Sequence, residues 1–394
     1  MKNLETLTQE LCPNGVEFVK LGDVLDYEQP TKYIVKCKDY QNEGMPVLTA
    51  GQTFILGYTD ETNGIFEASK ENPVIIFDDF TTSFHWVDFN FKVKSSAMKM
   101  LRVSSEREVS FRFVYYAMKC IKYQTLEHSR QWISKYSQIE IPLPPIEVQT
   151  EIVRILDKFT SLEAELEAEL DCRKRQYEYY RDKLLSFENV GGQEVEWKKM
   201  SEVFDMRNGY TPSKAKAEYW EGGTIPWFRM EDIRENGRIL SDSIQHITME
   251  GVKKGKLFPA NSFILATTAT IGEHALVIAD SLANQRFTNL TVCKSLSDRL
   301  LVKFVFHYMF IVDEWCKKNI NVSGFASVDM NKFKKLEFPI PSLEEQHRIV
   351  NILDRFESLT TSLQSGLPAE IAARRQQYEH YRDKLLTFKR KGTA

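Results

Sequence analysis

The sequence predicts an α+β fold built as a pseudo-two-fold tandem repeat, in which two globular α/β domains are separated by two long antiparallel helices. Three observations predict it: an internal duplication, a long helical stripe of apolar residues in each copy, and two inserts rich in strand-forming residues. The chain has 394 residues, of which 42% are hydrophobic and 27% charged, as is typical of a folded protein with more than one domain.

The duplication is carried by three pairs of matching blocks, the first of which pairs residues 16–21 with 195–200. Residues 142–159 and 339–356 are identical at ten of 18 positions, and residues 173–187 and 374–388 are identical at 11 of 15. The segments between these blocks, in contrast, resemble each other little. A frame that is repeated around dissimilar inserts indicates that the frame does one job twice, such as binding two copies of one partner, while the inserts recognise two different things.

This pattern divides the chain into four parts, two globular domains that alternate with two repeated helices. The predicted boundaries are residues 1–140 for the first domain, 141–188 for the central helix, 189–337 for the second domain and 338–394 for the C-terminal helix.

Each repeated block carries apolar residues at spacings of three, four or seven, which predicts a long helix. The first would run from Glu147 to Phe187, about 60 Å at 1.5 Å per residue, and therefore needs a partner to pack on. The second repeats the stripe from Ile349 to Phe388, so the two helices are natural partners in an antiparallel coiled coil. Because proline breaks a helix interior, we expect an interruption near Gly366, with a restart at about Pro368.

The central helix also contains the tetrad Leu-Glu-Ala-Glu twice in succession, from Leu162 to Glu169. Each copy would lengthen a helix by about 6 Å. Two interpretations agree with the residues: the tetrad is a spacer of defined length, or Leu, Ala and Glu are simply good helix formers on a solvated face.

We predict that the inserts are mixed domains of short strands followed by helices. Residues 73–101 and 258–290 alternate short apolar runs with polar patches and are rich in Val, Ile, Phe and Thr, which favours strands. Residues 111–122 and 302–318 follow with helical patterns.

Charge is segregated along the chain although the net charge is only −3. Ten Lys/Arg and three acids lie between Lys92 and Lys135, whereas eight acids and two bases lie between Glu147 and Asp171. One surface is therefore suited to meet phosphate. The acids near the N-terminus do not fit a secretion signal, and six scattered cysteines fit reduced, structural thiols, so we expect a cytoplasmic protein.

Polar and aromatic side chains gather at several places in the inserts, in mixtures suited to contacts with phosphates and base edges. In the first insert the candidates are Thr49, Gln52, Thr81, Thr82, Ser83, Lys92, Lys94, Ser95, Ser96 and Lys99. In the second they are Thr211, Ser213, Trp227, Arg229, Lys253, Lys254, Thr267, Thr268, Gln285 and Arg286. An edge strand exposed to solvent explains the group from Lys92 to Lys99 equally well.

The sequence lacks the motifs of a catalytic site. The run from Gly251 to Lys256 has the wrong spacing for a phosphate-binding loop, and Asn72-Pro73 lacks the second proline and aromatic of a methylase loop. The seven histidines are dispersed, and Asp78-Asp79 is more typical of a turn than of a metal site. We therefore predict a chain without catalytic residues and without a metal or cofactor of its own.

The motifs at the ends of the inserts resemble a known family. They are Ile-Pro-Leu-Pro-Pro-Ile-Glu-Val-Gln at 141–149, Phe-Pro-Ile-Pro-Ser-Leu-Glu-Glu-Gln at 338–346, Gly-Tyr-Thr-Pro-Ser at 209–213, Trp-Phe-Arg-Met-Glu-Asp at 227–232 and Ala-Thr-Ile-Gly at 269–272. Together they resemble the specificity subunit of type I restriction-modification enzymes, over almost the whole chain. The first insert lacks or alters the last three motifs, so its contact residues are less defined.

The resemblance implies a non-catalytic, DNA-binding subunit with two target-recognition domains. Each domain would read one half of a bipartite, asymmetric double-stranded target, with half-sites about one helical turn, ~10 bp, apart. The helices would dock two methyltransferase subunits and, through them, two motor-nuclease subunits, and the tetrad would set the gap between half-sites. S-adenosylmethionine, ATP and magnesium would belong to these partners. The candidate docking residues are Gln149, Ile152, Phe159, Tyr177, Arg181, Gln346, Ile349, Phe356, Tyr378 and Arg382.

Two other classes of protein remain as alternatives. One is a coiled-coil scaffold with two protein-binding domains and no DNA binding, against which the basic tract from Lys92 to Lys135 speaks. The other is a nuclease or methylase with a degenerate site, against which the missing loops speak.

Overall fold

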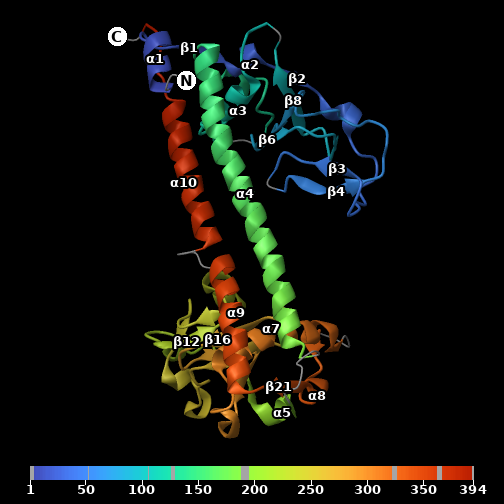
Figure 1. Cartoon of the computed structure of the whole chain (residues 1–394), viewed down its shortest axis with the longest axis vertical. Helices are drawn as coiled ribbons and strands as arrows, with labels where there is room; N and C mark the ends of the chain where they lie inside the picture. The colour runs from blue at the N-terminus through green and yellow to red at the C-terminus, as the bar shows by residue number, and fades with distance from the viewer. Residues whose placement is uncertain are drawn as a thin grey trace. The chain divides into compact units, whose positions relative to one another are not determined.

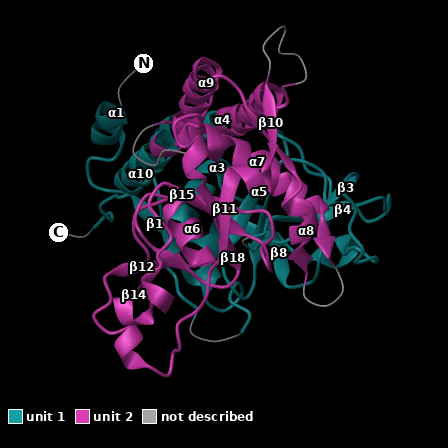
Figure 2. Ribbon diagram, turned by 90° about the horizontal axis from the view of Figure 1, so that it is seen from below, with its two compact units in different colours: residues 1–167, 370–394 teal, residues 168–369 magenta. Residues whose placement is uncertain are grey.

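The structure is a computed structural model that describes residues 4–51, 53–104, 106–125, 129–187, 195–321, 326–361 and 366–392. The chain forms two compact units, shown in different colours in Figure 2. Unit 1 comprises residues 1–167 and 370–394, and unit 2 comprises residues 168–369. Each unit therefore combines one insert with helical segments from both repeated blocks, whereas the four-part division above groups residues by sequence.

Unit 1 is built on a four-stranded antiparallel sheet with the order β2-β8-β5-β6. Its strands are β2 (Leu25–Glu28), β5 (Val74–Asp78), β6 (Phe84–Val87) and β8 (Met98–Val103). A smaller sheet of order β4-β3-β7 lies beside it, with β3 (Met45–Leu48), β4 (Ile55–Thr59) and β7 (Lys92–Val93). The helices of the insert are α2 (Leu21–Val24) and α3 (Phe111–Lys119).

Unit 2 repeats this design with a five-stranded sheet of order β11-β18-β15-β16-β13. Its strands are β11 (Phe204–Asn208), β13 (Ile239–Leu240), β15 (Ser262–Ala266), β16 (His274–Val277) and β18 (Phe287–Val292). The smaller sheet has the order β14-β12-β17, with β12 (Ile225–Phe228), β14 (His246–Ile247) and β17 (Leu282–Ala283). Further elements are α5 (Met200–Val203), α6 (Met230–Asn236), α7 (Val302–Lys318), α8 (Met330–Phe333), β19 (Ile320–Asn321) and β20 (Ser327–Val328).

The two inserts thus share one fold despite their different sequences. β2-β8-β5-β6 corresponds strand by strand to β11-β18-β15-β16, and in both small sheets the central strand pairs in parallel with the strand that follows the large-sheet hairpin. The predicted mixture of short strands and a following helix is confirmed in both inserts.

A two-stranded ribbon closes each insert and leads into a long helix. β1 (Glu17–Lys20) pairs with β9 (Glu140–Leu143), and β10 (Glu196–Lys199) pairs with β21 (Glu337–Ile340), with the same register. The repeated Pro-rich motif supplies the second strand of each ribbon. Because the helix starts immediately after that strand, the motif fixes where the helix leaves the domain.

The central helix α4 (Ile146–Leu185) is continuous over 40 residues, as predicted. Its repeat is interrupted, also as predicted: α9 (Leu343–Thr361) ends before Gly366, which has a φ of 92°, and α10 (Leu367–Leu385) begins one residue before Pro368. A left-handed φ is favoured by glycine, and proline fits the first turn of the helix that follows.

The helices pack in antiparallel pairs inside each unit. In unit 1, α10 runs beside the first part of α4 (Figure 1), and the ring of Phe159 stacks on Tyr381 with centroids 5.4 Å apart. In unit 2, α9 packs on the second part of α4, and Phe356 stacks on Tyr180 at 5.6 Å. These pairs are equivalent, because Phe159 and Phe356 occupy one position of the repeat and Tyr180 and Tyr381 another. The predicted antiparallel helix packing is confirmed.

Each unit has its own buried core. In unit 1 the core joins the face of the sheet around Phe77 to α3 around Phe113 and to α4 at Ile152. In unit 2 it joins Phe263 of the sheet to Phe304 of α7. Short α1 (Leu4–Leu11) packs on the helices of unit 1. Among the residues that the structure describes, no helix is long and apolar enough to cross a membrane.

Short 3-10 helices complete the described elements. They span Pro30–Tyr33 and Tyr136–Gln138 in unit 1, and Ala217–Tyr219, Met249–Gly251, Lys253–Gly255 and Lys294–Leu296 in unit 2.

Candidate nucleic-acid interface

Two loops occupy the same place in the two units. Residues 79–83 join β5 to β6 in unit 1, and residues 267–273 join β15 to β16 in unit 2. The first residue of each loop donates its amide to the segment after the small-sheet strand: Asp79 N to Ala97 O and Thr267 N to Arg286 O, both 2.9 Å. Its carbonyl accepts from a later segment, from Gln131 N in unit 1 and from Val328 N in unit 2.

A further segment joins this arrangement through another matching bond. Lys94 N donates to Leu48 O at 3.1 Å in unit 1, and Asn284 N donates to Phe228 O at 3.0 Å in unit 2. Four segments therefore converge in each unit, and we call this surface the four-loop face. In unit 1 it comprises residues 49–51, 79–83, 94–97 and 129–131, and in unit 2 residues 229, 267–273, 284–286 and 326–328.

The four-loop face of unit 1 carries mostly small hydroxyl donors and a few cations. Thr81 is exposed, and its hydroxyl hydrogen-bonds with that of Ser83 at 2.7 Å. Lys94 and Ser96 are exposed on the neighbouring segment, and Ser95 is half-buried. Several predicted candidates thus lie together on one surface, although they come from separate parts of the insert.

Three further candidates of the first insert have other placements. Thr49 is half-buried and its hydroxyl accepts from Gly51 N at 3.4 Å. Thr82 is largely buried, with a φ of 60° that turns the loop back toward β6. Gln52 lies outside the described residues.

The structure removes Lys92 and Lys99 from the candidate set, because both side chains are interior. Lys92 is 2% exposed, and its ammonium donates to Asn63 O at 2.6 Å and to Gly64 O at 3.0 Å. Lys99 is fully buried against the carboxylate of Asp79. Charge alone does not reveal which face of a strand a lysine occupies, and both strands here are buried on two sides.

The four-loop face of unit 2 carries larger groups with more hydrogen-bond donors. Gln285 and Arg286 are exposed side by side. Thr211 donates its hydroxyl to Gln285 Oε1 at 2.6 Å, which fixes the direction of that amide. Thr268 is half-buried, in a bridge to Ser327, and Thr267 is largely buried at the root of the loop.

Arg229 stands on the same face, at the start of α6. Its guanidinium lies over the ring of Trp227, 5.9 Å from the centroid, and 3.9 Å from Glu231. Trp227 itself is 2% exposed and donates its indole N–H to Tyr210 O at 3.0 Å. The structure therefore removes Trp227 from the set of contact candidates and makes it a support for Arg229.

Ser213, Lys253 and Lys254 are exposed on neighbouring loops of unit 2. The ammonium of Lys253 lies 4.4 Å from the centroid of the Tyr210 ring, whose hydroxyl accepts from the amide of Lys253. Lys253 therefore lies against the residue that precedes Thr211, whose hydroxyl bonds Gln285 of the four-loop face.

The individual sequence motifs did not indicate Arg130 of unit 1. Its guanidinium is 55% exposed and reaches within 4.0 Å of the buried carboxylate of Asp79 at the root of the 79–83 loop. The basic tract from Lys92 to Lys135 includes Arg130, but only the tertiary structure places it beside the loop. Ser327 occupies the corresponding position in unit 2. It precedes Val328, whose amide bonds the loop root of unit 2 as the amide of Gln131 bonds that of unit 1.

The paired glutamines of the repeated motif are structural. Gln149 accepts from Ser110 N at 2.9 Å and donates to Pro144 O at 2.8 Å, and it is 1% exposed. Gln346 makes the matching bonds with Leu301 N and Pro341 O and is fully buried. Each ties the start of its long helix to the helix of the insert, and the structure removes both from the set of docking candidates.

Other docking candidates also face the interior of their own unit. Ile152 and Ile349 are fully buried. Tyr177 and Arg181 pack on Phe310 of α7 in unit 2, with Arg181 5.1 Å from the ring centroid. Tyr378 contacts the ring of Tyr116 in unit 1, and Arg382 pairs with Asp383.

Some aromatic rings of the helices do face outward, and they form one stacked pair in each unit. Phe159 and Phe356 are half-buried, and their partners Tyr381 and Tyr180 are 42% and 39% exposed. The predicted Phe159 and Phe356 therefore remain docking candidates. The two tyrosines were missed, although the matching positions of the repeat could have indicated them.

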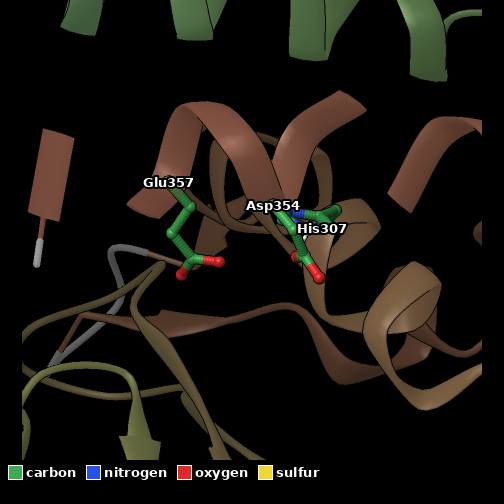
Figure 3. Close-up of side chains that lie close together, drawn as sticks. All are labelled: His307, Asp354 and Glu357. Atoms are coloured by element: carbon green, nitrogen blue, oxygen red, sulfur yellow. Dashed lines mark hydrogen bonds and ion pairs between the residues drawn. The ribbon is translucent and has the colours of Figure 1, made fainter. Parts of the chain in front are cut away.

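A charged junction joins α7 to α9 in unit 2 (Figure 3). His307 Nε2 lies 2.8 Å from Asp354 Oδ1, and Glu357 follows one turn later on α9. Within the described part of the chain, these three residues form a group whose ligand atoms lie close enough for a metal ion, within 4.8 Å of one another. However, Lys303 lies 3.4 Å from Asp354 and 3.6 Å from Glu357, so a protein cation already balances both carboxylates.

Unit 1 has the same junction with different side chains. Arg112 Nε donates to Asp157 Oδ1 at 2.8 Å, and the hydroxyl of Tyr116 donates to the same oxygen at 2.5 Å. Burial and this bond to a carboxylate raise the pKa of Tyr116, so it stays neutral. Arg112 and Lys303 are equivalent, as are Tyr116 and His307, and the junction is therefore an ion pair that joins insert to helix in both units.

Comparison with known proteins identifies the fold and the repeat. Residues 13–171 and 193–373 each match the type I restriction modification DNA specificity domain. The chain is 46% identical to the EcoR124I/EcoR124II specificity subunit of Escherichia coli, over the full length of both chains. The chain belongs to the specificity subunits of type I restriction-modification systems. It is also 54% identical to the EcoprrI specificity subunit of the same species, over 53% of each chain.

Solved structures of this family show the same fold. The specificity subunit from M. genitalium has a TM-score of 0.52 at 15% identity and covers 94% of this chain and 96% of its own. A chain from a study of complex assembly in a type I restriction-modification system has a TM-score of 0.55 at 17% identity, over 95% of this chain and 98% of its own.

Membership of the family defines the general role of the chain. It is the non-catalytic subunit that determines which DNA sequence a type I restriction-modification complex recognises, and it works as part of that complex on DNA. The two matched domains are target-recognition domains, and each corresponds to one insert with its frame.

Proposed function

We propose that each unit reads one half of a bipartite, asymmetric DNA sequence through its four-loop face. The observation that carries this proposal is that the same four segments converge in both units through matching backbone bonds but present different side chains. Matching backbone bonds give both units the same way of approaching a duplex. Different side chains give each unit its own sequence preference.

The chemistry of the two faces suits contacts of different kinds. Arginine is the side chain best shaped for the two acceptors of guanine, and the amide of glutamine can pair with adenine. Arg286 and Gln285 therefore suit base contacts in unit 2. In unit 1, Lys94 and Arg130 suit phosphates or guanine, and the hydroxyls of Thr81 and Ser96 suit either.

The helices serve the second part of the function, the docking of two methyltransferase subunits. The stacked pairs Phe159–Tyr381 and Phe356–Tyr180 are matching half-exposed aromatic surfaces, one in each unit. Aromatic side chains of this kind dominate protein interfaces. Two motor-nuclease subunits would bind through the methyltransferases. S-adenosylmethionine, ATP and magnesium would be bound by these partners, and this chain would bind none of them.

The tetrad from Leu162 to Glu169 would set the distance between half-sites. It lies within α4, the helix that both units share, so adding or removing one copy changes the length of that helix by about 6 Å. That change is close to the rise of two base pairs. Half-sites near one helical turn apart would let both four-loop faces approach one side of the duplex.

The test is co-expression of the chain with its methyltransferase and motor subunits, followed by mapping of N6-methyladenine in the host genome. We expect one bipartite motif. Arg286→Ala should relax one half of the motif and Arg130→Ala the other half, and removal of one tetrad should change only the gap.

Matched controls lie at the opposite ends of the same sheets. Lys294 follows β18 where Arg286 precedes it, and Arg107 follows β8 in unit 1. Lys294→Ala and Arg107→Ala should leave both halves of the motif unchanged. A stable complex that methylates no motif would contradict the proposal and favour the scaffold without DNA binding.

A further inference from the structure

Asp79 is a buried carboxylate at the centre of the four-loop face of unit 1. It is 1% exposed, and its Oδ1 accepts from Trp132 N at 2.9 Å. Its Oδ2 lies 3.4 Å from the ammonium of the fully buried Lys99 and 4.0 Å from the guanidinium of Arg130. One side chain therefore meets a cation inside the domain and a cation on its surface.

The backbone of Asp79 adds two more connections. Its amide donates to Ala97 O, and its carbonyl accepts from Gln131 N at 2.8 Å. Asp79 also begins the 79–83 loop, so it is joined to three of the four segments of the face. The fourth segment, residues 49–51, directly follows Leu48, whose carbonyl accepts from Lys94 N.

Unit 2 makes the same backbone bonds, but neither residue at the base of its loop is charged. Thr267 replaces Asp79, and Thr288 replaces Lys99, because Leu265 pairs with Thr288 as Phe77 pairs with Lys99. The two threonine hydroxyls lie 3.2 Å apart. A neutral pair is therefore sufficient to build this loop root, and the fold itself does not require the ion pair.

A buried ion pair contributes little net free energy to the stability of a loop. Removing two charges from water offsets much of their attraction, and apolar or neutral replacements are often as stable. What the carboxylate provides and the threonine does not is an electrostatic hold on Arg130, whose guanidinium is half exposed to solvent. The carboxylate at this position therefore acts on a cation at the surface of the domain, Arg130.

We propose that Asp79 is a positioning residue for target recognition: its carboxylate, balanced by Lys99, aims Arg130 at the DNA and fixes the 79–83 loop beside it. This inference rests on the proposed function of the four-loop face. It assigns sequence discrimination in one half of the target to a side chain that does not itself touch the DNA.

The experiment measures discrimination in each half of the target separately. The complex of this chain with its methyltransferase is offered duplex libraries that are randomised in one half-site at a time, and the methylated sequences are counted. The half that Arg286→Ala alters is assigned to unit 2, and the other half to unit 1. Thermal unfolding of each purified variant is recorded in parallel.

Two variants separate positioning from folding. Asp79→Asn removes the charge but keeps the shape, and we expect about a tenfold loss of discrimination in the half read by unit 1, with the other half unchanged. The double variant Asp79→Thr/Lys99→Thr places in unit 1 the two threonines that occupy these positions in unit 2. It leaves no buried charge at the loop root, so we expect near-native unfolding with the same one-sided loss of discrimination. Thr267→Val is the matched control in unit 2 and should leave the half read by unit 1 unchanged.

The outcomes distinguish this inference from the proposed function. If the folded Asp79 variants keep full discrimination in both halves, or lose it equally in both, Asp79 is not a positioning residue and the inference is overturned. If in addition Arg286→Ala alters neither half, the four-loop face does not read DNA and the proposed function fails with it. Loss confined to the half read by unit 1, in the well-folded double variant, supports both.

Discussion

Unit 1 and unit 2 share one backbone architecture but differ in the charged side chains that it carries. The frame is held by identical side chains at matching positions, of which Gln149 and Gln346 are the clearest pair, each bonded to the same two kinds of backbone group. At the loop root the units differ, with an Asp79–Lys99 ion pair in one and a Thr267–Thr288 pair in the other.

The difference shows which parts of the design are fixed by geometry and which by recognition. Backbone bonds at the helix start must be repeated, because both long helices leave their domains in the same way. The loops must differ, because two halves of an asymmetric sequence present different acceptors and donors. The inserts can therefore diverge in sequence while the hydrogen bonds of the frame keep their strands in register.

The largest expected effect concerns a buried pair that unit 2 has and unit 1 lacks. His274 is fully buried, with Nδ1 2.6 Å from Asp313 Oδ2, and its equivalent in unit 1 is Phe84. His274→Phe leaves the buried carboxylate of Asp313 without this donor and should destabilise the chain by about 3 kcal/mol. Calorimetric unfolding measures the loss.

The comparison with unit 1 supplies the control for this variant. Because Phe84 packs against the ring of Tyr115 at this position, the double variant His274→Phe/Asp313→Leu should recover most of the lost stability. If His274→Phe alone unfolds like the native chain, the pair contributes nothing and the two positions are interchangeable.

A smaller effect is expected at the paired glutamines. Gln149→Ala leaves a buried amide and a buried carbonyl without partners, which should lower the free energy of unfolding by about 2 kcal/mol. Gln346 also donates to Arg299 O at 2.8 Å, so Gln346→Ala should have the larger effect of the two, about 2.5 kcal/mol. Urea unfolding tests the order, and Gln376→Ala, at an exposed position of α10, is the neutral control.

The charged junction of unit 2 should make the stability of the folded chain depend on pH in the acidic range. Burial alone would raise the pKa of Asp354, but the hydrogen bond from His307 and the charge of Lys303 hold it below its ordinary value of 3.8. Since the folded pKa is depressed, the stability it contributes is present above pH 4 and is lost as pH falls through the lowered pKa.

The measurement compares unfolding of the native chain and of Asp354→Asn between about pH 5 and 3, in steps across the ordinary carboxyl range. The difference between them should shrink as the pH falls. A constant difference over this range would show that Asp354 does not titrate differently in the folded and unfolded chain. The effect is modest, because the side chain is 37% exposed.

The smallest effect is expected at the surface of the helix pair in unit 1. Arg375 pairs with Glu163 and Glu167 across the helices, but it is 55% exposed. Exposed ion pairs contribute little, so Arg375→Ala should lower the unfolding free energy by about 0.5 kcal/mol. Lys174→Ala, at the matching position of unit 2, is the control and should change it less. A loss above 2 kcal/mol at Arg375 would mean that the ion pairs hold the helices together.

The repeat explains why so much of the architecture could be predicted. Identity at matching positions reports a shared backbone, and apolar spacing reports a helix, so the length of α4, its interrupted repeat at Gly366 and the antiparallel packing all followed from the order of residues. Strand-forming composition likewise predicted mixed inserts, because β-branched and aromatic residues favour a pleated, half-buried surface.

The site could be predicted only in part. Polar candidates such as Thr81, Lys94, Gln285 and Arg286 do lie on the four-loop faces, but Lys92, Lys99 and Trp227 are interior. Composition marks a segment as suitable for DNA and leaves open which of its side chains reach the surface, because that depends on which face of each strand is covered.

By itself, the sequence determined that this protein has two similar frames, two dissimilar inserts and a pair of long helices, since repetition and periodicity are properties of residue order. The tertiary structure decided which residues meet. It joined Asp79 to Arg130 across 51 positions of the chain, gave Asp79 and Thr267 the same place in two unlike sequences, and turned the paired glutamines inward. These choices depend on strand register and burial, which are set by contacts between segments that are distant in the sequence.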